Sequence, residues 1–464
     1  MSLMHPGYTL YNLMLPVARA AARVASFYNE KIAEGLEGRK GIAERWRRKA
    51  AALNREKRLI WFHVSSVGEF EQAKPVMNLL AERLGEDTQI ALTFYSPSGM
   101  NYYEKFDRSR RIDAVRFVEY LPVDTRANAK FCMDTLRPDA IIYVKFDLWP
   151  NLILEASRRG IPQMLVSGTL SPGSRRLSRL ARGFYADVYS RLDAIAAISD
   201  EDADRFRRGL KAVRRAKQQE HEDDGAEHTP GGEPGIPKII TAGDTRFDQV
   251  CSRIDSSRVK LPGALTRSSR RFLIGGSTWP KDEEVVIPGF ARLMGRFPDA
   301  GLIVAPHEPT PQRLEEIDAQ LRRDGIAYTL LSEIGDEGSI ETPAIVADGI
   351  GYLAELYRSG YLAYVGGSFT TGVHNVMEPA VLGLPVFFGP RIDNSYEAGK
   401  LVELGAGKIV RDAGEFAAEA AALLADENIR RERGGTGAGF IRNHCGAAIH
   451  CVDLIEQRLR KSST

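Results

Sequence analysis

From residue 58 onward, short apolar runs alternate with longer amphipathic stretches. The apolar runs have the length of buried strands, and the stretches between them repeat apolar residues at helical spacing. This alternation predicts an α/β fold, with parallel sheets and crossover helices. The expected strands are 58–66, 89–96, 114–122, 139–146, 163–169, 194–199, 238–243, 271–277, 300–306, 327–332, 344–348, 362–368 and 385–390, and the expected helices include 70–84 and 128–136.

A polar segment at 217–235 separates the two halves. It is rich in Gly, Pro, Asp and Glu, which predicts a disordered or solvent-exposed insertion. At 464 residues the chain is too long for one core, so two domains are expected. We expect an N-terminal helical segment at 1–55, Rossmann-like domains at 56–248 and 249–440, and a terminal helix at 441–464. Ligands should bind in a central cleft that the carboxyl ends of both sheets face.

The apolar N-terminal stretch, residues 7–28, is interrupted by Pro16, Arg19 and Arg23, so it is too polar to span a membrane. Its start lacks the positive charge of a signal peptide. A basic run containing Trp46 follows it. This pattern suits a helix lying in the interface of an anionic membrane. A helix packed on the domain fits the same pattern equally well.

Composition narrows the possible functions. The net charge is only +2, which disfavours nucleic acid as a partner. Four scattered cysteines without a CxxC pair indicate a reducing environment, and no Cys/His group has zinc spacing, so we expect no metal. Acidic pairs within 199–204 are more simply explained as a helix cap.

The candidate catalytic and ligand-binding residues lie in the loops that follow strands. Glu69 follows the strand 58–66 and falls in the first turn of a helix, where a simple capping acid would also be stable. Ser66 and Gly68 precede it, and the glycine lets the backbone approach a ligand closely.

Two glycine-rich turns in the second half lead toward helices, whose free N–H groups suit a phosphate. The first contains Ser277 and Thr278; the second, Gly366-Gly367, leads to His374, Asn375 and Glu378. No GxGxxG is followed by an acidic ribose ligand, which disfavours a dinucleotide oxidoreductase.

Taken together, the segments WFHVSSVGE, LWPN, GDTRFD, GGST and VGGSFTTGVHNVMEPAVLGLPVFFGP resemble the bacterial Kdo transferases. These enzymes move 3-deoxy-D-manno-oct-2-ulosonic acid (Kdo) from its CMP derivative onto the lipid A precursor. The resemblance runs from about residue 5 to residue 440 and implies a GT-B-type fold, no cofactor, inversion at the anomeric carbon and a place in lipopolysaccharide biosynthesis. It also implies an N-terminal anchor on the cytoplasmic face of the bacterial inner membrane, peripheral or monotopic.

The resemblance implies roles for particular residues. Glu69 would be the catalytic base. The donor-binding residues would be Arg246, Ser277, Thr278, His307, Gly366, Gly367, His374, Asn375 and Glu378. The acceptor-binding residues would be Ser66, Gly68, Arg175, Arg176 and Arg179, since guanidinium groups suit the phosphates of the acceptor. A solvated helix face would give the same run of arginines.

The sequence also departs from the family. Lys145-Phe146-Asp147 stands where two glutamates are common, and His307 stands near a missing arginine. Arg246 stands where lysine is frequent, which changes the donor geometry. Two other interpretations remain: an enzyme of the same fold using a UDP-sugar, or a non-catalytic module that binds the membrane surface.

Overall fold

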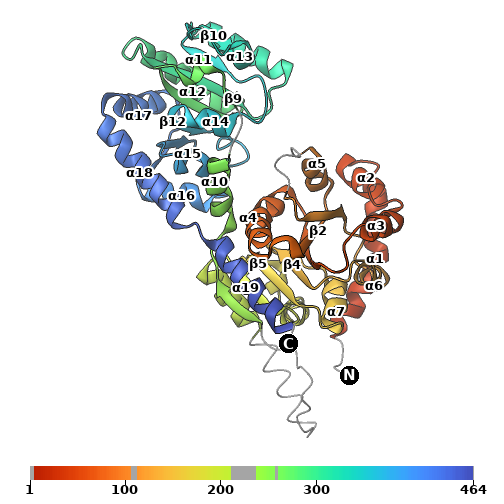
Figure 1. Cartoon of the computed structure of the whole chain (residues 1–464). Helices are drawn as coiled ribbons and strands as arrows, with labels where there is room; N and C mark the ends of the chain where they lie inside the picture. The colour runs from red at the N-terminus through yellow and green to blue at the C-terminus, as the bar shows by residue number, and fades with distance from the viewer. Residues whose placement is uncertain (1–4, 106–111, 211–236, 257–259, 463–464) are drawn as a thin grey trace. The chain divides into compact units, whose positions relative to one another are not determined.

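The structure is a computed structural model that describes residues 5–105, 112–210, 237–256 and 260–462. The insertion expected at 217–235 lies outside these residues. The chain divides into two compact units, here called unit 1 (Met1–Gln249 with Cys445–Thr464) and unit 2 (Val250–His444). Each unit is a parallel sheet covered by helices on both faces (Figure 1).

The sheet of unit 1 has seven parallel strands in the order β3-β2-β1-β4-β5-β6-β7. Its strands are β1 (Arg58–Val64), β2 (Thr88–Phe94), β3 (Val115–Tyr120), β4 (Ala140–Val144), β5 (Gln163–Gly168), β6 (Ala194–Ala197) and β7 (Lys238–Thr241). Its helices are α1 (Pro6–Ala25), α2 (Glu30–Glu37), α3 (Ile42–Ala51), α4 (Val67–Leu84), α5 (Pro97–Lys105), α6 (Arg126–Leu136), α7 (Pro150–Arg158) and α8 (Arg182–Ser190). Two 3₁₀ turns, η1 (Gly85–Asp87) and η3 (Arg175–Leu177), complete this part of the unit.

The central strands of unit 1 are mostly apolar because both faces of the sheet are covered. Successive residues of β1 enter different cores: Trp61 packs in one hydrophobic cluster and Phe62 in the other. Ile141 and Ile142 of β4 divide in the same way. Because neighbouring side chains of a strand point to opposite faces, this alternation decides which face of the sheet each side chain near the carboxyl ends of the strands occupies.

The sheet of unit 2 also has seven parallel strands, in the order β10-β11-β9-β8-β12-β13-β14. Its strands are β8 (Arg271–Thr278), β9 (Ala300–Pro306), β10 (Tyr328–Leu330), β11 (Ala344–Val346), β12 (Gly360–Val365), β13 (Val386–Phe388) and β14 (Gly407–Ile409). Its helical segments are α11 (Gly263–Thr266), α12 (Pro280–Met294), α13 (Pro311–Arg323), η4 (Leu331–Glu333), α14 (Leu353–Arg358), α15 (Met377–Val381), α16 (Tyr396–Glu403), α17 (Ala413–Ala425) and α18 (Glu427–Asn443). Helix α10 (Thr245–Ser256) contains the division between the units.

The last helix, α19 (Ala447–Ser462), returns to unit 1 and packs against α4 and β6. Cys451 and Ile455 are fully buried there, and the Gly446 N–H donates to Asp248 Oδ1 at 2.7 Å. Unit 2 therefore ends at His444 rather than at the expected residue 440, because α18 continues unbroken to Asn443.

The N-terminal helices differ from one another in their surroundings. Trp46 on α3 is fully buried, packs edge-on against Trp61 and Phe117, and donates its indole N–H to Tyr120 O at 3.0 Å. The expectation that Trp46 is an interfacial aromatic is thus wrong, since it is a core residue. Helix α1 is attached through Tyr8, which is fully buried against α8.

Candidate active site

Glu69 occupies the third position of α4, directly after β1, and is 5% exposed. Its Oε2 atom accepts the N–H groups of Ser65 and Ser66, at 2.8 and 2.7 Å, and the Ser66 hydroxyl at 2.9 Å. The capping role that its position predicted is therefore real. Oε1 makes no hydrogen bond to a described residue, so the carboxylate has one oxygen held by the helix start and one left for other chemistry.

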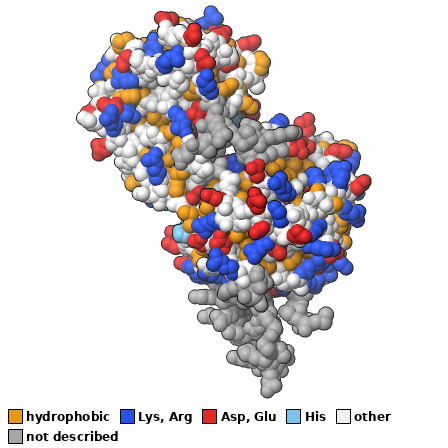
Figure 2. All heavy atoms as spheres, viewed as in Figure 1, with side chains coloured by type: hydrophobic (Ala, Val, Ile, Leu, Met, Phe, Trp, Pro, Cys, Tyr) orange, Lys and Arg blue, Asp and Glu red, His pale blue; other side chains and the backbone are white. Residues whose placement is uncertain are grey.

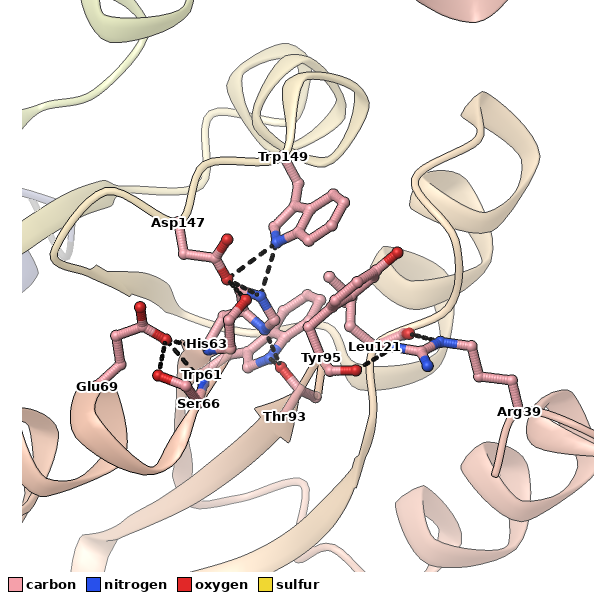
Figure 3. A network of polar contacts seen from close by, with 11 residues as sticks. Arg39, Trp61, His63, Ser66, Glu69, Thr93, Tyr95, Leu121, Asp147 and Trp149 are labelled. Atoms are coloured by element: carbon pink, nitrogen blue, oxygen red, sulfur yellow. Dashed lines mark hydrogen bonds and ion pairs between the residues drawn. The ribbon is translucent and has the colours of Figure 1, made fainter. Parts of the chain in front are cut away.

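A chain of hydrogen bonds lies beside this loop (Figure 3). The Trp61 indole N–H donates to Thr93 Oγ1 at 2.9 Å, and Thr93 Oγ1 lies 2.9 Å from His63 Nδ1. His63 Nε2 lies 2.9 Å from Asp147 Oδ2 and 2.7 Å from the Trp149 indole nitrogen, whose N–H donates to it.

Asp147 joins this chain to the loop of Glu69. Its Oδ2 accepts the hydroxyl of Ser65, whose N–H donates to Glu69, so Ser65 bridges the two carboxylates. The Trp149 indole N–H also reaches Asp147 Oδ2, at 3.3 Å. Burial acts to raise the pKa of Asp147, but the hydrogen bonds and charge of these neighbours, His63 foremost, hold that pKa below its ordinary value.

The predicted acceptor residues lie at the ends of β1 and β5. Arg176 lies over the rings of Phe146 and Tyr185, with its guanidinium carbon 5.2 and 5.5 Å from their centroids. Lys145 Nζ is 5.1 Å from the centroid of the same Phe146 ring. Two cations are thus brought together around one aromatic side chain after β4. Two more predicted acceptor residues, Arg175 and Arg179, are exposed in and near η3. The other two, Ser66 and Gly68, lie at the start of α4.

In unit 2, the predicted donor loops meet at the carboxyl ends of β8 and β12. A Cβ atom on Gly366 would lie 2.3 Å from the carbonyl oxygen of Ser277, so the two loops are in direct contact. Ser277 has a left-handed backbone, with φ of 51°, an unfavourable conformation that is concentrated at functional sites. Thr278 is buried and donates its hydroxyl to Glu283 Oε1 at 2.7 Å.

Asp282, in the first turn of α12, holds these loops together. It is 1% exposed, and its Oδ2 accepts the N–H groups of Gly367 at 2.8 Å and Trp279 at 2.9 Å. Its Oδ1 accepts the hydroxyl of Tyr364 at 2.8 Å. Burial raises the pKa of Asp282, and these bonds offset part of that effect.

Three aromatic rings form a platform beside these loops. The Trp279 N–H donates to His374 Nε2 at 2.9 Å, and the planes of the two rings are nearly parallel, inclined by 12°. His307 stacks on His374, with centroids 4.5 Å apart, and on Trp279 at 5.0 Å. Burial and then the neighbouring His307 lower the pKa of His374. The platform therefore offers a flat surface and a neutral His374 ring.

The other predicted donor residues have structural partners. Glu378 accepts from the Arg253 guanidinium at 2.8 Å, and Asn375 Oδ1 accepts the Met377 N–H at 3.0 Å. Arg246 lies in unit 1, where its Nη2 contacts Asp244 Oδ2 at 2.7 Å.

The sequence interpretation missed several residues of these groups. Trp279 and Asp282 adjoin the GGST turn, and the position of the carboxylate three residues after Trp279 is the signal of a helix start. His63 and Trp149 lie within the segments WFHVSSVGE and LWPN, but their meeting depends on the pairing of β1 with β4, which no single segment encodes. Among the described residues, no group of three or more His, Cys, Asp or Glu could hold a metal ion. No described helix is long and apolar enough to cross a membrane.

Comparison with known proteins agrees with this architecture. A putative UDP-N-acetylglucosamine 2-epimerase from Listeria monocytogenes has 14% sequence identity and a TM-score of 0.54 over 87% of this chain and 97% of that one, a likeness of fold alone. The two Rossmann-like units make this an α/β protein of the GT-B type.

Residues 40–217 match the family model of 3-deoxy-D-manno-octulosonic-acid transferase (kdotransferase). The 3-deoxy-D-manno-octulosonic acid transferase of Chlamydophila psittaci is 27% identical over 75% of this chain and 73% of its own length. The Haemophilus influenzae enzyme of that name is 24% identical over 87% of this chain and 88% of its own. The chain is thus similar to the Kdo transferases over most of its length.

Proposed function

We propose that the protein transfers Kdo from CMP-Kdo to the lipid A precursor, with inversion at the anomeric carbon and Glu69 as general base. The observation that carries this proposal is the difference between the two oxygens of the Glu69 carboxylate. Three donors fix Oε2, while Oε1 makes no hydrogen bond to a described residue. A base must be both positioned and open to a substrate proton, and this arrangement provides both conditions.

In the proposed reaction, an acceptor hydroxyl attacks the anomeric carbon of Kdo. A bond forms between that oxygen and the carbon, and the hydroxyl proton moves to Glu69 Oε1. The bond from the carbon to the phosphate oxygen breaks, and CMP leaves with the electron pair. Attack from the face opposite the leaving group gives inversion, and general base catalysis of this kind contributes roughly 10²–10⁴-fold.

The donor would bind at the carboxyl edge of the unit 2 sheet. Ser277, Thr278, Gly366 and Gly367 adjoin one another there, and backbone N–H groups at such turns suit a phosphate. The platform of Trp279, His307 and His374 supplies a flat aromatic surface of the kind that stacks on a nucleobase. A thermal shift with CMP that exceeds the shift with UDP supports this assignment, whereas a larger shift with UDP supports the rival UDP-sugar enzyme.

The lipid acceptor would be met at an anionic membrane surface, the cytoplasmic face of the inner membrane of a Gram-negative bacterium. Helix α1 exposes large apolar side chains, and Leu180 near η3 is 100% exposed. The exposed apolar residues of α1 and the segment after it are Leu10, Leu13, Met14, Val17, Val24, Phe27 and Tyr28. Basic side chains are frequent on the face of unit 1 in view in Figure 2. Apolar surface flanked by cations is typical of peripheral membrane binding.

The arginines after β5 are proposed to hold the phosphates of the acceptor. Replacing Arg175 and Arg176 with Gln should weaken acceptor use far more than donor use, because the donor loops belong to unit 2. Equal loss of both would refute this assignment. A third interpretation, a non-catalytic module on the membrane surface, predicts that wild-type protein binds vesicles but transfers no Kdo.

A further inference from the structure

Arg39 links the N-terminal helices to the carboxyl edge of the unit 1 sheet (Figure 3). It follows α2, and its guanidinium donates to three carbonyl oxygens. The acceptors are Gly35 O at 2.8 Å, Leu121 O at 3.0 Å and Tyr95 O at 2.6 Å. Leu121 directly follows β3 and Tyr95 directly follows β2, so one side chain holds the ends of two neighbouring strands to the N-terminal segment.

The same guanidinium fixes an aromatic pair. Its central carbon lies 4.4 Å from the centroid of the Tyr95 ring. The Tyr95 ring also packs against Trp149, with ring centroids 4.3 Å apart and planes inclined by 34°. The Trp149 indole N–H then points at the pair formed by His63 and Asp147, 2.7 Å from His63 Nε2 and 3.3 Å from Asp147 Oδ2.

From Asp147 the contacts continue to the loop of the proposed base. The Ser65 hydroxyl donates to Asp147, and the Ser65 N–H donates to Glu69 Oε2 at 2.8 Å. Arg39 is thus joined to Glu69 by an unbroken series of contacts through Tyr95, Trp149, Asp147 and Ser65.

We propose that Arg39 is a positioning residue for the reaction: it clamps Tyr95 on Trp149 and thereby sets the place of Asp147 and of the loop that carries Glu69. The proposal rests on the proposed function for the role of Glu69 as base. It adds that the N-terminal helices, which carry the membrane-facing residues, support the acceptor site directly. The way these helices pack on unit 1 then affects the rate of Kdo transfer as well as binding to the membrane.

A purely structural role would not require this kind of side chain. All three acceptors of Arg39 are neutral carbonyls, and it forms no ion pair with a described residue. Burial of the guanidinium lowers the pKa of Arg39, a sign that its charge is costly where it lies. A planar cation can bind carbonyls at its edge while its face attracts an aromatic ring, and Arg39 uses both properties at once.

The test compares Arg39→Gln with Arg55→Gln in the full-length protein. Arg55 is the matched control because it also donates to three carbonyls, those of Ala50, Thr135 and Leu136, but contacts no described aromatic ring. It precedes β1, whereas Glu69 follows that strand. Fluorine NMR on protein labelled with 5-fluorotryptophan reports on the four tryptophans separately, with each signal assigned by a Trp→Phe variant.

In Arg39→Gln we expect the Trp149 signal to move while that of Trp279, in unit 2, stays in place. We expect kcat for Kdo transfer to fall by roughly 10- to 100-fold, the effect of a small misplacement of a catalytic group, with little change in donor KM. Arg55→Gln, at an exposed side chain, should lower Tm by less than Arg39→Gln and leave kcat and the Trp149 signal unchanged. Arg39→Lys should recover Tm but not kcat, because an ammonium lacks the planar face.

Three outcomes would overturn the proposal: an unmoved Trp149 signal, an unchanged kcat, or an equal loss of kcat in the Arg55 control. If the wild-type protein transfers no Kdo, the proposed function fails. In that case the Trp149 signal still decides whether Arg39 holds the aromatic pair.

Discussion

Asp282 is the residue whose replacement should most specifically loosen the donor loops. Its carboxylate accepts three hydrogen bonds, two from backbone N–H groups and one from Tyr364. In Asp282→Asn the amide oxygen can take the place of Oδ2, and the new amide nitrogen then faces the Tyr364 hydroxyl. The bond from Tyr364, worth roughly 1.5 kcal/mol, is lost, and the two backbone bonds end on a neutral acceptor and weaken by roughly 1 kcal/mol each, while removal of a buried charge recovers part of that sum. We expect a net destabilisation of about 2–3 kcal/mol.

Hydrogen exchange followed by mass spectrometry measures this loss locally, which avoids assuming two-state unfolding in a two-unit chain. The peptide containing Gly367 should exchange on the order of 30- to 150-fold faster in the variant, the fold-change that corresponds to this free energy. Asp412→Asn is the control: Asp412 caps the exposed start of α17 in the same unit, and asparagine caps as well as aspartate. Unchanged exchange at Gly367, or equal acceleration in both variants, would show that Asp282 does not hold the donor loops.

Three further predictions concern other parts of the molecule. Burial raises the pKa of Asp124 to about 6, so the folded state binds more protons than the unfolded state between pH 4 and 6. Stability should therefore fall by about 3 kcal/mol as pH rises through that window. Asp124→Asn should flatten this slope in Tm measured against pH, and an unaltered slope would contradict the assignment. Gly366→Ala places a Cβ atom 2.3 Å from the Ser277 carbonyl, so the loops must separate. The stabilisation by CMP in a thermal shift assay should be lost, and a shift equal to that of wild type would be the contrary result. Leu13 and Val17 are 70% and 60% exposed on α1, and burying such a side chain contributes roughly 1.5–3 kcal/mol. Replacing both with Glu should lower sedimentation with anionic vesicles at least about tenfold, whereas undiminished binding would place the membrane contact elsewhere.

The α/β fold could be predicted from the sequence because fully buried parallel strands read as apolar runs. Every expected strand is present, and β14 was missed because Gly407 and Lys408 interrupt the apolar run that marks the other strands. The sequence could not predict where α19 packs either. Its apolar stripe says only that it packs on something, and the contacts that hold it to α4 lie more than 300 residues away in the chain, as with Arg83 and Asp453.

The candidate site was predictable where a motif is local. Ser277 lies at the end of β8, Gly366 follows β12 directly and Glu69 lies in the first turn after β1, so their positions in the fold come from the pattern. The neighbours that orient them come from other strands. Asp147 was noted only as a departure from the family, and its bond to His63 depends on strand pairing that no single segment encodes. Trp46 is the opposite case. Because it lies in a basic run, the sequence predicted a residue at the membrane interface, but it is buried in the core.

The most direct test of the account is transfer of radiolabelled Kdo, with the CMP donor generated in situ, onto purified tetra-acylated lipid A precursor. Wild-type protein is compared with Glu69→Ala and with Glu69→Gln, which keeps the size of the side chain and one acceptor oxygen for the helix start. We expect product from wild type and a loss of roughly 10²–10⁴-fold in both folded variants. Equal product from wild type and Glu69→Gln would contradict the assigned base. No product from folded wild-type protein presented with vesicles would contradict the function.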